Sequence, residues 1–358
     1  MELSTQRENY NSFDIAKFIC SILVVMIHVV PFGTQETTNV FSYANFFLKS
    51  GLCRIAVPLF FMFSGFFLYK KTPLDEFSCA PSKKYFLNIL KLYILWSLIY
   101  FPIKFVNMDM SLSGIIKGTI LYGITFICSG SYVQLWYLNA LLVSIAIISF
   151  LLHKKCSPKK VLIISAIFYI VGLLFNGYYG LVAPLTKLPL IGDAITLYFN
   201  IFYSTRNGLF FAFFFMALGM YLSNKDVLIP EKKSFLLFLG SSLLLCIEVF
   251  MLNKFDIAQD YSILVFTVPA ALFCFLWLKE IDLKNSNIYV YMRKISSLIF
   301  YAHTFVLYIV LQITKALSIS IDHTPLLFLI VLTITILISI AIIELSNKKP
   351  FYWLKNFY

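Results

Sequence analysis

Lys17 and His28 are the first residues of this sequence whose types and spacing could carry chemistry. They lie eleven residues apart in one long segment, FDIAKFICSILVVMIHVVPF. At about 100° per residue, eleven steps bring both side chains to nearly the same helix face, and a rise of about 1.5 Å per residue separates them by roughly 16 Å. Because ionisable groups are costly within a bilayer, both residues are candidates for a functional site.

The imidazole of His28 predicts proton transfer, because histidine titrates near neutral pH and could activate a hydroxyl group as a general base. Arg54 lies about ten residues into the next apolar segment, which returns across the bilayer, so we expect it to face the same cavity as His28. Glu248 is predicted at or beyond the midplane, where an unpaired carboxylate costs several kcal/mol. We therefore expect it to pair with Arg54, Arg206 or His28.

His303 lies about eight residues into the apolar segment predicted at 295–316, which places it in the inner half of the bilayer. Two interpretations are open for this imidazole. It could line, together with Lys17, a cytoplasmic mouth for an anionic cofactor, or it could form a hydrogen bond between helices. Lys49 and Lys91 are expected to extend their ammonium groups to an interface.

The composition indicates whether these residues belong to a soluble protein or to a membrane protein. The 358 residues are 60% hydrophobic and 13% charged, far below the roughly 25% charged residues of soluble domains. The net charge of +12 is explained by basic residues in cytoplasmic loops, so we expect no nucleic-acid partner. These features predict an all-α polytopic protein of the bacterial plasma membrane.

Ten apolar segments are long enough to cross a bilayer, which requires about 20 residues each. The segment 111–128 is shorter and richer in Gly, Ser and Thr, and is predicted to be re-entrant or interfacial. We expect a single domain over 1–358 with short tails at 1–12 and 346–358. The ten predicted spans are 13–32, 44–69, 85–106, 134–152, 161–177, 206–223, 235–252, 262–278, 295–316 and 325–345.

The basic residues predict the orientation of these spans. With the N-terminus inside, 19 of the 29 basic residues fall in cytoplasmic segments and three fall on the opposite side. This asymmetry favours ten helices with both termini in the cytoplasm. The sequence shows no cleavage site after its polar start, no cysteine pair on the outer side and no metal-ligand spacing, so we expect a retained first helix and no metal.

Several motifs resemble the acyltransferase 3 family of bacterial membrane O-acyltransferases. The sequence DIAK at 14–17 followed by His28 is similar to the first helix of that family, whose pattern places a basic residue eleven positions before a histidine. The stretch 54–66, RIAVPLFFMFSGF, looks like its second-helix signature of Arg, Val-Pro, Phe-Phe and Ser-Gly. Further matches are LWYL at 135–138 and the stretch 297–303. The resemblance covers essentially the whole chain.

This resemblance implies an acyltransferase that moves an acyl group, commonly acetyl, from a cytoplasmic acyl-CoA to the hydroxyl of an extracytoplasmic or membrane-bound glycan, lipid or small molecule. His28 would act as base or acyl relay, and Lys17 and Arg54 would hold phosphate or carboxylate groups. Lys17 replaces the usual Arg, which keeps the charge but loses the bidentate geometry. No permanently bound cofactor is implied, since acetyl-CoA is a co-substrate. The other predicted binding residues are Ser64, Trp136, Tyr137, Arg206, Glu248, Tyr301 and His303.

A more detailed likeness within the family is to the membrane half of the serine racemases of vancomycin-resistance clusters. It rests on 172–179, on YSTRNG at 203–208 and on FDI at 255–257. We expect no racemase domain, because the sequence ends about a dozen residues after its last span and has no pyridoxal-phosphate lysine motif. The likeness leaves an alternative open, a carrier for serine or a similar amino acid. The sequence also leaves open whether the chain forms a homodimer.

Overall fold

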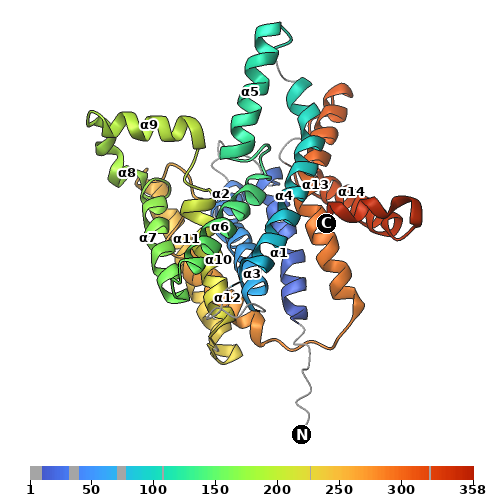
Figure 1. Ribbon diagram of the computed structural model, residues 1–358. Helices are drawn as coiled ribbons and strands as arrows, with labels where there is room; N and C mark the ends of the chain where they lie inside the picture. The colour runs from blue at the N-terminus through green and yellow to red at the C-terminus, as the bar shows by residue number, and fades with distance from the viewer. Residues whose placement is uncertain (1–9, 32–39, 71–77, 107–108, 226, 322–323) are drawn as a thin grey trace.

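Long apolar helices that run between the two ends of the molecule make up most of the protein in this computed structural model (Figure 1). The structure describes residues 10–31, 40–70, 78–106, 109–225, 227–321 and 324–358. The predicted N-terminal tail at 1–12 therefore lies almost entirely outside the described residues. The part of the chain that is described contains no strand, which confirms the all-α prediction.

The helices begin and end close to the predicted apolar segments, and several carry the expected N-terminal caps. Ser286, for example, precedes the longest helix, and its side chain accepts a hydrogen bond from the backbone N–H of Ile288. The elements are α1 Asn11–Val29, α2 Val40–Ser50, η1 Leu52–Ile55, α3 Ala56–Lys70, α4 Cys79–Val106, α5 Leu112–Cys128, α6 Trp136–His153, α7 Pro158–Leu174, α8 Tyr179–Val182, η2 Ala183–Lys187, α9 Ile191–Phe202, η3 Gly208–Ala212, α10 Phe213–Ser223, α11 Glu231–Lys254, α12 Thr267–Glu280, α13 Asn287–Ala316, α14 Pro325–Ser346 and η4 Lys349–Phe357.

Within the described residues, seven helices are long and apolar enough to cross a membrane, or up to eight if a pair bent by 84° between α7 and α8 counts as one span. The protein is therefore polytopic, as predicted, while the count of ten and the cytoplasmic location of both termini stay predictions. The spans predicted at 206–223 and 262–278 form the shorter helices η3–α10 and α12. The segment 111–128 forms one unbroken helix, α5, which has no buried residue.

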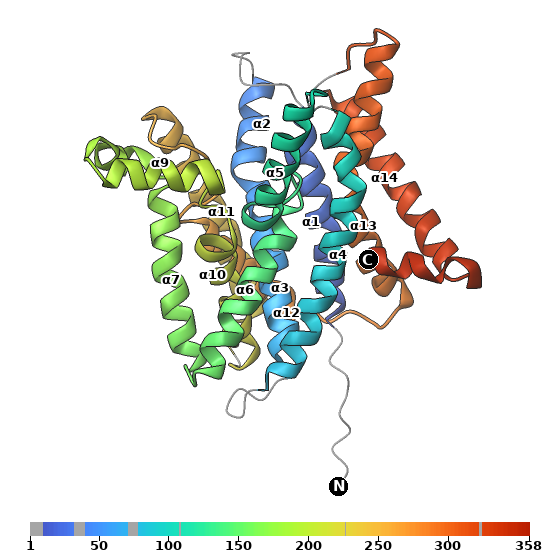
Figure 2. The same ribbon diagram turned by 45° about the horizontal axis from the view of Figure 1, so that its top comes forward.

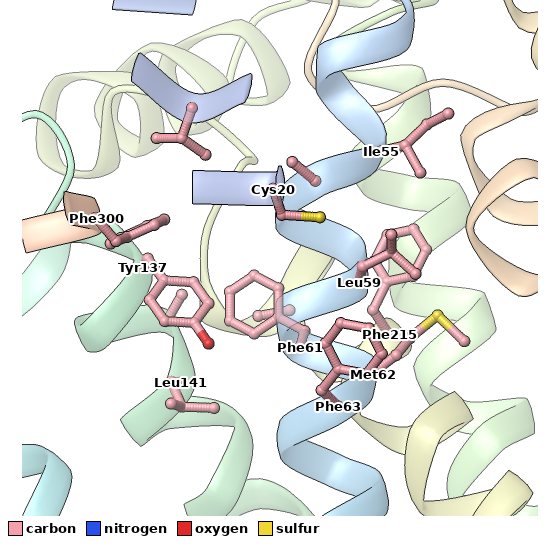
Figure 3. Close-up of a cluster of buried hydrophobic side chains, with 14 of the residues drawn as sticks. Cys20, Ile55, Leu59, Phe61, Met62, Phe63, Tyr137, Leu141, Phe215 and Phe300 are labelled. Carbon is pink, nitrogen blue, oxygen red and sulfur yellow. The ribbon is translucent and has the colours of Figure 1, made fainter. Parts of the chain in front are cut away.

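Helices α3 and α10 cross with their backbones in contact. A Cβ atom added at Gly65 would lie 2.1 Å from the carbonyl oxygen of Met216, and one added at Gly219 would lie 2.1 Å from that of Met62. Only glycine permits such an approach, as at small-residue helix crossings in membranes. Figure 3 shows large apolar side chains packed around this crossing, among them Met62 and Phe215. The crossing fixes α3 as a rigid wall in the centre of the bundle.

The C-terminal segment folds back against α4 as the helix η4. The indole N–H of Trp96 donates to the carbonyl oxygen of Phe357 at 3.2 Å, and the Lys91 ammonium donates to the Asn356 side-chain oxygen at 2.8 Å. The hydroxyls of Ser346 and Tyr358 lie 2.7 Å apart. Lys91 therefore binds the C-terminal segment, and its extension toward an interface stays a prediction. Figure 2 places the C-terminus beside α4 and α13.

Candidate functional site

A large cavity opens at the end of the bundle where α1, α4 and α13 begin. Its volume is about 850 Å³, and it is lined by those helices together with α3, α6 and the C-terminal segment. We call it the basic cavity, because no acidic side chain occurs among the described residues that line it. Such a cavity attracts polyanions such as phosphates. Its basic side chains are Lys17, Lys84, Lys91, Arg293 and Lys355.

Lys17 is held at one wall of the basic cavity by a carboxylate on its own helix. Its ammonium lies 3.3 Å from the Asp14 carboxylate, and the Nε of Arg293 lies 3.9 Å from the same oxygen. The Lys17 ammonium also lies over the rings of Phe63 and Phe67, 5.6 and 4.8 Å from their centroids. One carboxylate thus balances two cations, so this wall keeps a net positive charge.

Three of the predicted polar residues, Ser64, Tyr137 and Tyr301, also line the basic cavity. The hydroxyls of Ser64 and Tyr137 lie 3.4 Å apart. At its inner end the cavity is closed by the rings of Phe60, Tyr137 and Phe300, which contact one another at centroid distances of 4.9 to 6.0 Å. In Figure 3 the Tyr137 ring lies between Phe300 and Phe61.

Beyond these rings lies a second cavity of about 40 Å³, which we call the His28 chamber. His28 and Arg54 both line it, as the sequence predicted. Phe300 lines both this chamber and the basic cavity, so it forms part of the wall between them. The other lining residues are Val24, Ile27, Val57, Gln134, Trp136, Arg206, Phe211 and Ser262.

Two guanidinium groups give the His28 chamber its charge. Arg54 donates to the Ser262 hydroxyl at 3.0 Å and lies 3.5 Å from the Asp260 carboxylate. Arg206 donates to the same hydroxyl at 3.4 Å and stacks on Trp136, 4.8 Å from the ring centroid. The buried Nε atoms of both arginines have no hydrogen-bond partner among the described residues. Two cations and one carboxylate leave a net charge of about +1, which suits an anion or a developing negative charge.

Asp260 and Ser262 were not predicted as site residues, and both lie in the loop between α11 and α12, although Ser262 was expected at the start of the span 262–278. The Asn176 side-chain oxygen fixes this loop by accepting from the backbone N–H groups of Ser262 and Ile263 at 3.2 and 3.0 Å. Burial raises the pKa of the Asp260 carboxyl, but the charges of Arg54 and Arg206 outweigh it and hold that pKa below its ordinary value. A signal for Asp260 was present in the sequence, because two arginines deep in the protein require a carboxylate partner.

Arg206 is positioned by an unusual backbone. It lies two residues before η3, a π-helical turn that continues into α10. Asn207 begins this turn, and its side-chain oxygen accepts from the backbone N–H groups of Leu209 and Phe210 at 3.0 and 3.1 Å. Such turns are frequent at functional sites. The turn holds Arg206 against the His28 chamber.

His303 lies beside His28, so the predicted place with Lys17 at a cytoplasmic mouth is wrong. The two imidazole centroids are 5.2 Å apart, and His303 is fully buried. The depth was misjudged because α13 begins at Asn287, eight residues before the predicted span. The Nδ1 of His303 donates to the Ile299 carbonyl oxygen at 2.9 Å, which leaves Nε2 without a partner among the described residues. His303 can therefore accept a further hydrogen bond or a proton.

Glu248 does not pair with Arg54, Arg206 or His28, which corrects the predicted ion pair. Its buried carboxylate accepts three hydrogen bonds, from the Tyr178 hydroxyl at 2.8 Å and from two backbone N–H groups at 2.7 and 2.8 Å. These N–H groups belong to Val265 and Phe266, where α12 begins and its dipole favours a carboxylate. Backbone amides thus satisfy the charge that the prediction assigned to a basic side chain.

Glu248→Gln is expected to lower the free energy of unfolding by about 1–3 kcal/mol, because one of the two accepting oxygens becomes a donor that faces a backbone donor. The measurement is the midpoint of thermal unfolding in detergent. Glu344→Gln is the matched control, since Glu344 accepts one exposed hydrogen bond from Tyr291, and we expect it to stay within about 0.5 kcal/mol of the wild type. Equal midpoints for Glu248→Gln and the wild type would contradict the assigned structural role.

A third cavity of about 540 Å³ lies at the opposite end of the bundle, between the last turns of α1 and α13 and the start of α14. We call it the polar cavity. His28 lines both the His28 chamber and the polar cavity. The chamber therefore has the basic cavity on one side and the polar cavity on the other. The polar side chains of the latter are Gln312, Thr314, Lys315, Ser318 and Ser320.

Comparison with known proteins identifies the family of this chain. The model of the acyltransferase 3 family, described as an acyltransferase domain, matches residues 10–344, nearly the whole chain. The chain belongs to the acyltransferase 3 family. It is accordingly an acyltransferase of groups other than aminoacyl groups, and a multi-pass protein of the bacterial membrane.

Curated relatives of this acyltransferase 3 protein are named as racemases. Two amino-acid racemases of Enterococcus faecalis are 32% and 27% identical over 74% and 94% of the chain, and a serine/alanine racemase of Enterococcus gallinarum is 28% identical over 73%. The matched regions cover only 35%, 46% and 36% of those relatives. The chain thus matches less than half of their length. No solved structure matches the chain.

Proposed function

We propose that this acyltransferase moves an acyl group, acetyl in the first instance, from a cytoplasmic acyl-CoA to a hydroxyl group of an extracytoplasmic or membrane-bound acceptor. The observation that supports it most strongly is the position of His28. The imidazole borders a small, positively charged chamber that has a large basic cavity on one side and a polar cavity on the other. If the donor and the acceptor arrive from opposite sides, the reacting group must lie between two cavities, as His28 does.

The basic cavity is the proposed site for the donor. Coenzyme A carries phosphate groups, and the five basic side chains of this cavity offer ammonium and guanidinium donors to them. The thioester end would point inward, toward the rings of Phe60, Tyr137 and Phe300. The hydroxyls of Ser64 and Tyr137 lie near this inner end and can donate to the donor's amide groups.

The proposed reaction is a direct transfer at His28. The imidazole takes the proton of the acceptor hydroxyl, the oxygen attacks the thioester carbonyl carbon, and the carbon–sulfur bond breaks. His28 then returns the proton to the sulfur, so the products are an ester and the free thiol of coenzyme A. Arg54 and Arg206 would stabilise the negative charge on the carbonyl oxygen, since both carry N–H groups without partners among the described residues.

His303 is the proposed positioning residue for His28. Its ring is fixed through Nδ1 by the Ile299 carbonyl, and its unpaired Nε2 belongs to a ring 5.2 Å from that of His28. A hydrogen bond from His28 to this nitrogen would set the orientation of the catalytic imidazole, as a second group does in known catalytic triads. The acceptor would approach through the polar cavity, which His28 also lines.

Coenzyme A binding tests the donor site. We expect coenzyme A to raise the midpoint of thermal unfolding, because a ligand of the folded state stabilises it. Lys84→Gln and Lys355→Gln should each weaken binding about fivefold, since an exposed ion pair contributes up to about 1 kcal/mol. Lys160→Gln, an exposed lysine at the start of α7 that is absent from the cavity lining, is the control. No shift with coenzyme A, or equal affinities in all variants, would contradict the assignment.

A second candidate function is a carrier for serine or a similar amino acid. Cavities that approach His28 from both ends also suit a transport path, and a carboxylate could bind between Arg54 and Arg206. The names of the relatives concern amino acids. This function predicts uptake of labelled serine into proteoliposomes without acetyl-CoA, whereas the acyltransferase predicts none.

A further inference from the structure

The His28 chamber is very small for a site of acyl transfer. Its volume of about 40 Å³ is enough for only a small group, since a single water already needs about 10–15 Å³. The acetyl group has three non-hydrogen atoms, whereas butyryl has five. In contrast, the basic cavity measures about 850 Å³ and imposes no comparable limit.

Phe300 forms the wall that keeps the chamber small. It lines both cavities, and only 4% of its surface is exposed. Its ring contacts Phe60 at 5.4 Å and Tyr137 at 4.9 Å, measured between centroids, and Tyr137 is itself packed on Phe61 at 4.6 Å. Close-packed rings resist displacement, because moving one opens a void beside the others.

Two other walls of the chamber, formed by Trp136 and by α1, are also filled by packed side chains. Trp136 contacts Phe211, with 6.0 Å between centroids, and lies under the Arg206 guanidinium, so its indole is fixed from two sides. On the α1 side the lining is Val24, which is 3% exposed, together with Ile27 and His28. Among the described residues, Phe300 is the one that lines both the chamber and the basic cavity, from which the donor is proposed to enter.

We propose that Phe300 is a specificity-determining residue that restricts the donor to acetyl-CoA. The inference rests on the proposed function, since it assumes that the acyl group reaches the His28 chamber. Each additional methylene would have to displace a packed ring, and one methylene group in an apolar pocket changes the specificity constant by about 10–200-fold. We expect acetyl-CoA to be preferred over butyryl-CoA by at least about 30-fold in kcat/KM.

The test is the release of coenzyme A thiol from acetyl-CoA and from butyryl-CoA by the full chain in nanodiscs. Phe300→Ala is expected to open the chamber to the basic cavity, and it should reduce the preference for acetyl-CoA to about threefold or less. Phe300→Leu keeps an apolar side chain in the wall and should give an intermediate preference. If the alanine variant fails to fold, the leucine variant tests the role of Phe300. Phe305→Ala, five residues further along α13 and absent from both linings, should leave the wild-type preference unchanged.

The outcomes separate this inference from the proposed function. Comparable kcat/KM for both donors in the wild type, or an unchanged preference in a folded Phe300 variant, would refute the role of Phe300 while acyl transfer stands. Release of thiol from neither donor by the wild type would refute the proposed function, and the inference with it. A preference that falls in the Phe300 variants and persists in Phe305→Ala would support it.

Discussion

Replacing His28 with alanine is expected to lower the rate of acetyl transfer by about 10³-fold, because a positioned general base contributes about 10² to 10⁴-fold. The hydroxyl of an acceptor is a weak nucleophile until its proton is removed, and His28 is the imidazole that lines both the chamber and the polar cavity. The measurement is the steady-state release of coenzyme A thiol from acetyl-CoA. His28→Gln should be as inactive as the alanine variant, since an amide cannot accept the proton.

The folding of the His28 variants needs a control that removes an imidazole elsewhere. His153 lies exposed at the end of α6, with its Nδ1 4.0 Å from the Cys79 sulfur, and lines none of the three cavities. We expect His153→Ala to keep wild-type activity. His28 forms no hydrogen bond with any residue that the structure describes, so the midpoint of thermal unfolding should change little in its variants. A His28→Ala protein that turns over normally would exclude the proposed mechanism.

Arg54→Gln is expected to lower kcat by about 10²-fold and to leave the KM for acetyl-CoA nearly unchanged. The reason is that removing one donor to a developing oxyanion typically costs 10² to 10³-fold, whereas Arg54 lies outside the basic cavity that is proposed to bind the nucleotide. The measurement is the dependence of the initial rate on acetyl-CoA concentration. A change in KM alone would place Arg54 in donor binding instead.

Asp260→Asn provides the matched control for Arg54. Arg54→Gln and Asp260→Asn both remove the ion pair between the two side chains. Only Asp260→Asn retains both guanidinium groups in the chamber. We expect Asp260→Asn to keep activity within about tenfold of the wild type, since electrostatic stabilisation by Arg54 and Arg206 remains. If the asparagine variant loses as much activity as Arg54→Gln, the ion pair itself matters and Arg54 has a structural role.

The helices, and the meeting of His28 and Arg54 in one cavity, could be predicted from the sequence because both depend on local rules. Apolar segments of about 20 residues become helices in a bilayer, since a helix satisfies every backbone group within the segment. Counting residues along such helices placed His28 and Arg54 in one cavity, as the structure has them. The same counting was wrong for His303, because polar residues from Asn287 onward extend the helix beyond its apolar part.

The remaining features depend on tertiary contacts that leave no periodic signal. Glu248 is satisfied by backbone amides at the start of another helix, and Asp260 reaches the arginines from a loop. Lys355 reaches the basic cavity because the C-terminal segment folds back on α4. None of these three contacts can be derived from the spacing of residues along the chain. The wall at Phe300 is likewise visible only where three rings from three helices meet.

The central claim is that this chain transfers an acyl group at His28 and does not carry an amino acid across the membrane. One proteoliposome experiment tests it most directly, with release of thiol from acetyl-CoA and uptake of labelled serine measured on the same preparation. The account predicts thiol release by the wild type, with water as the acceptor if no better hydroxyl is supplied, loss of that release in His28→Ala, and no serine uptake. Serine uptake that needs no acetyl-CoA, without any release of thiol, would contradict it.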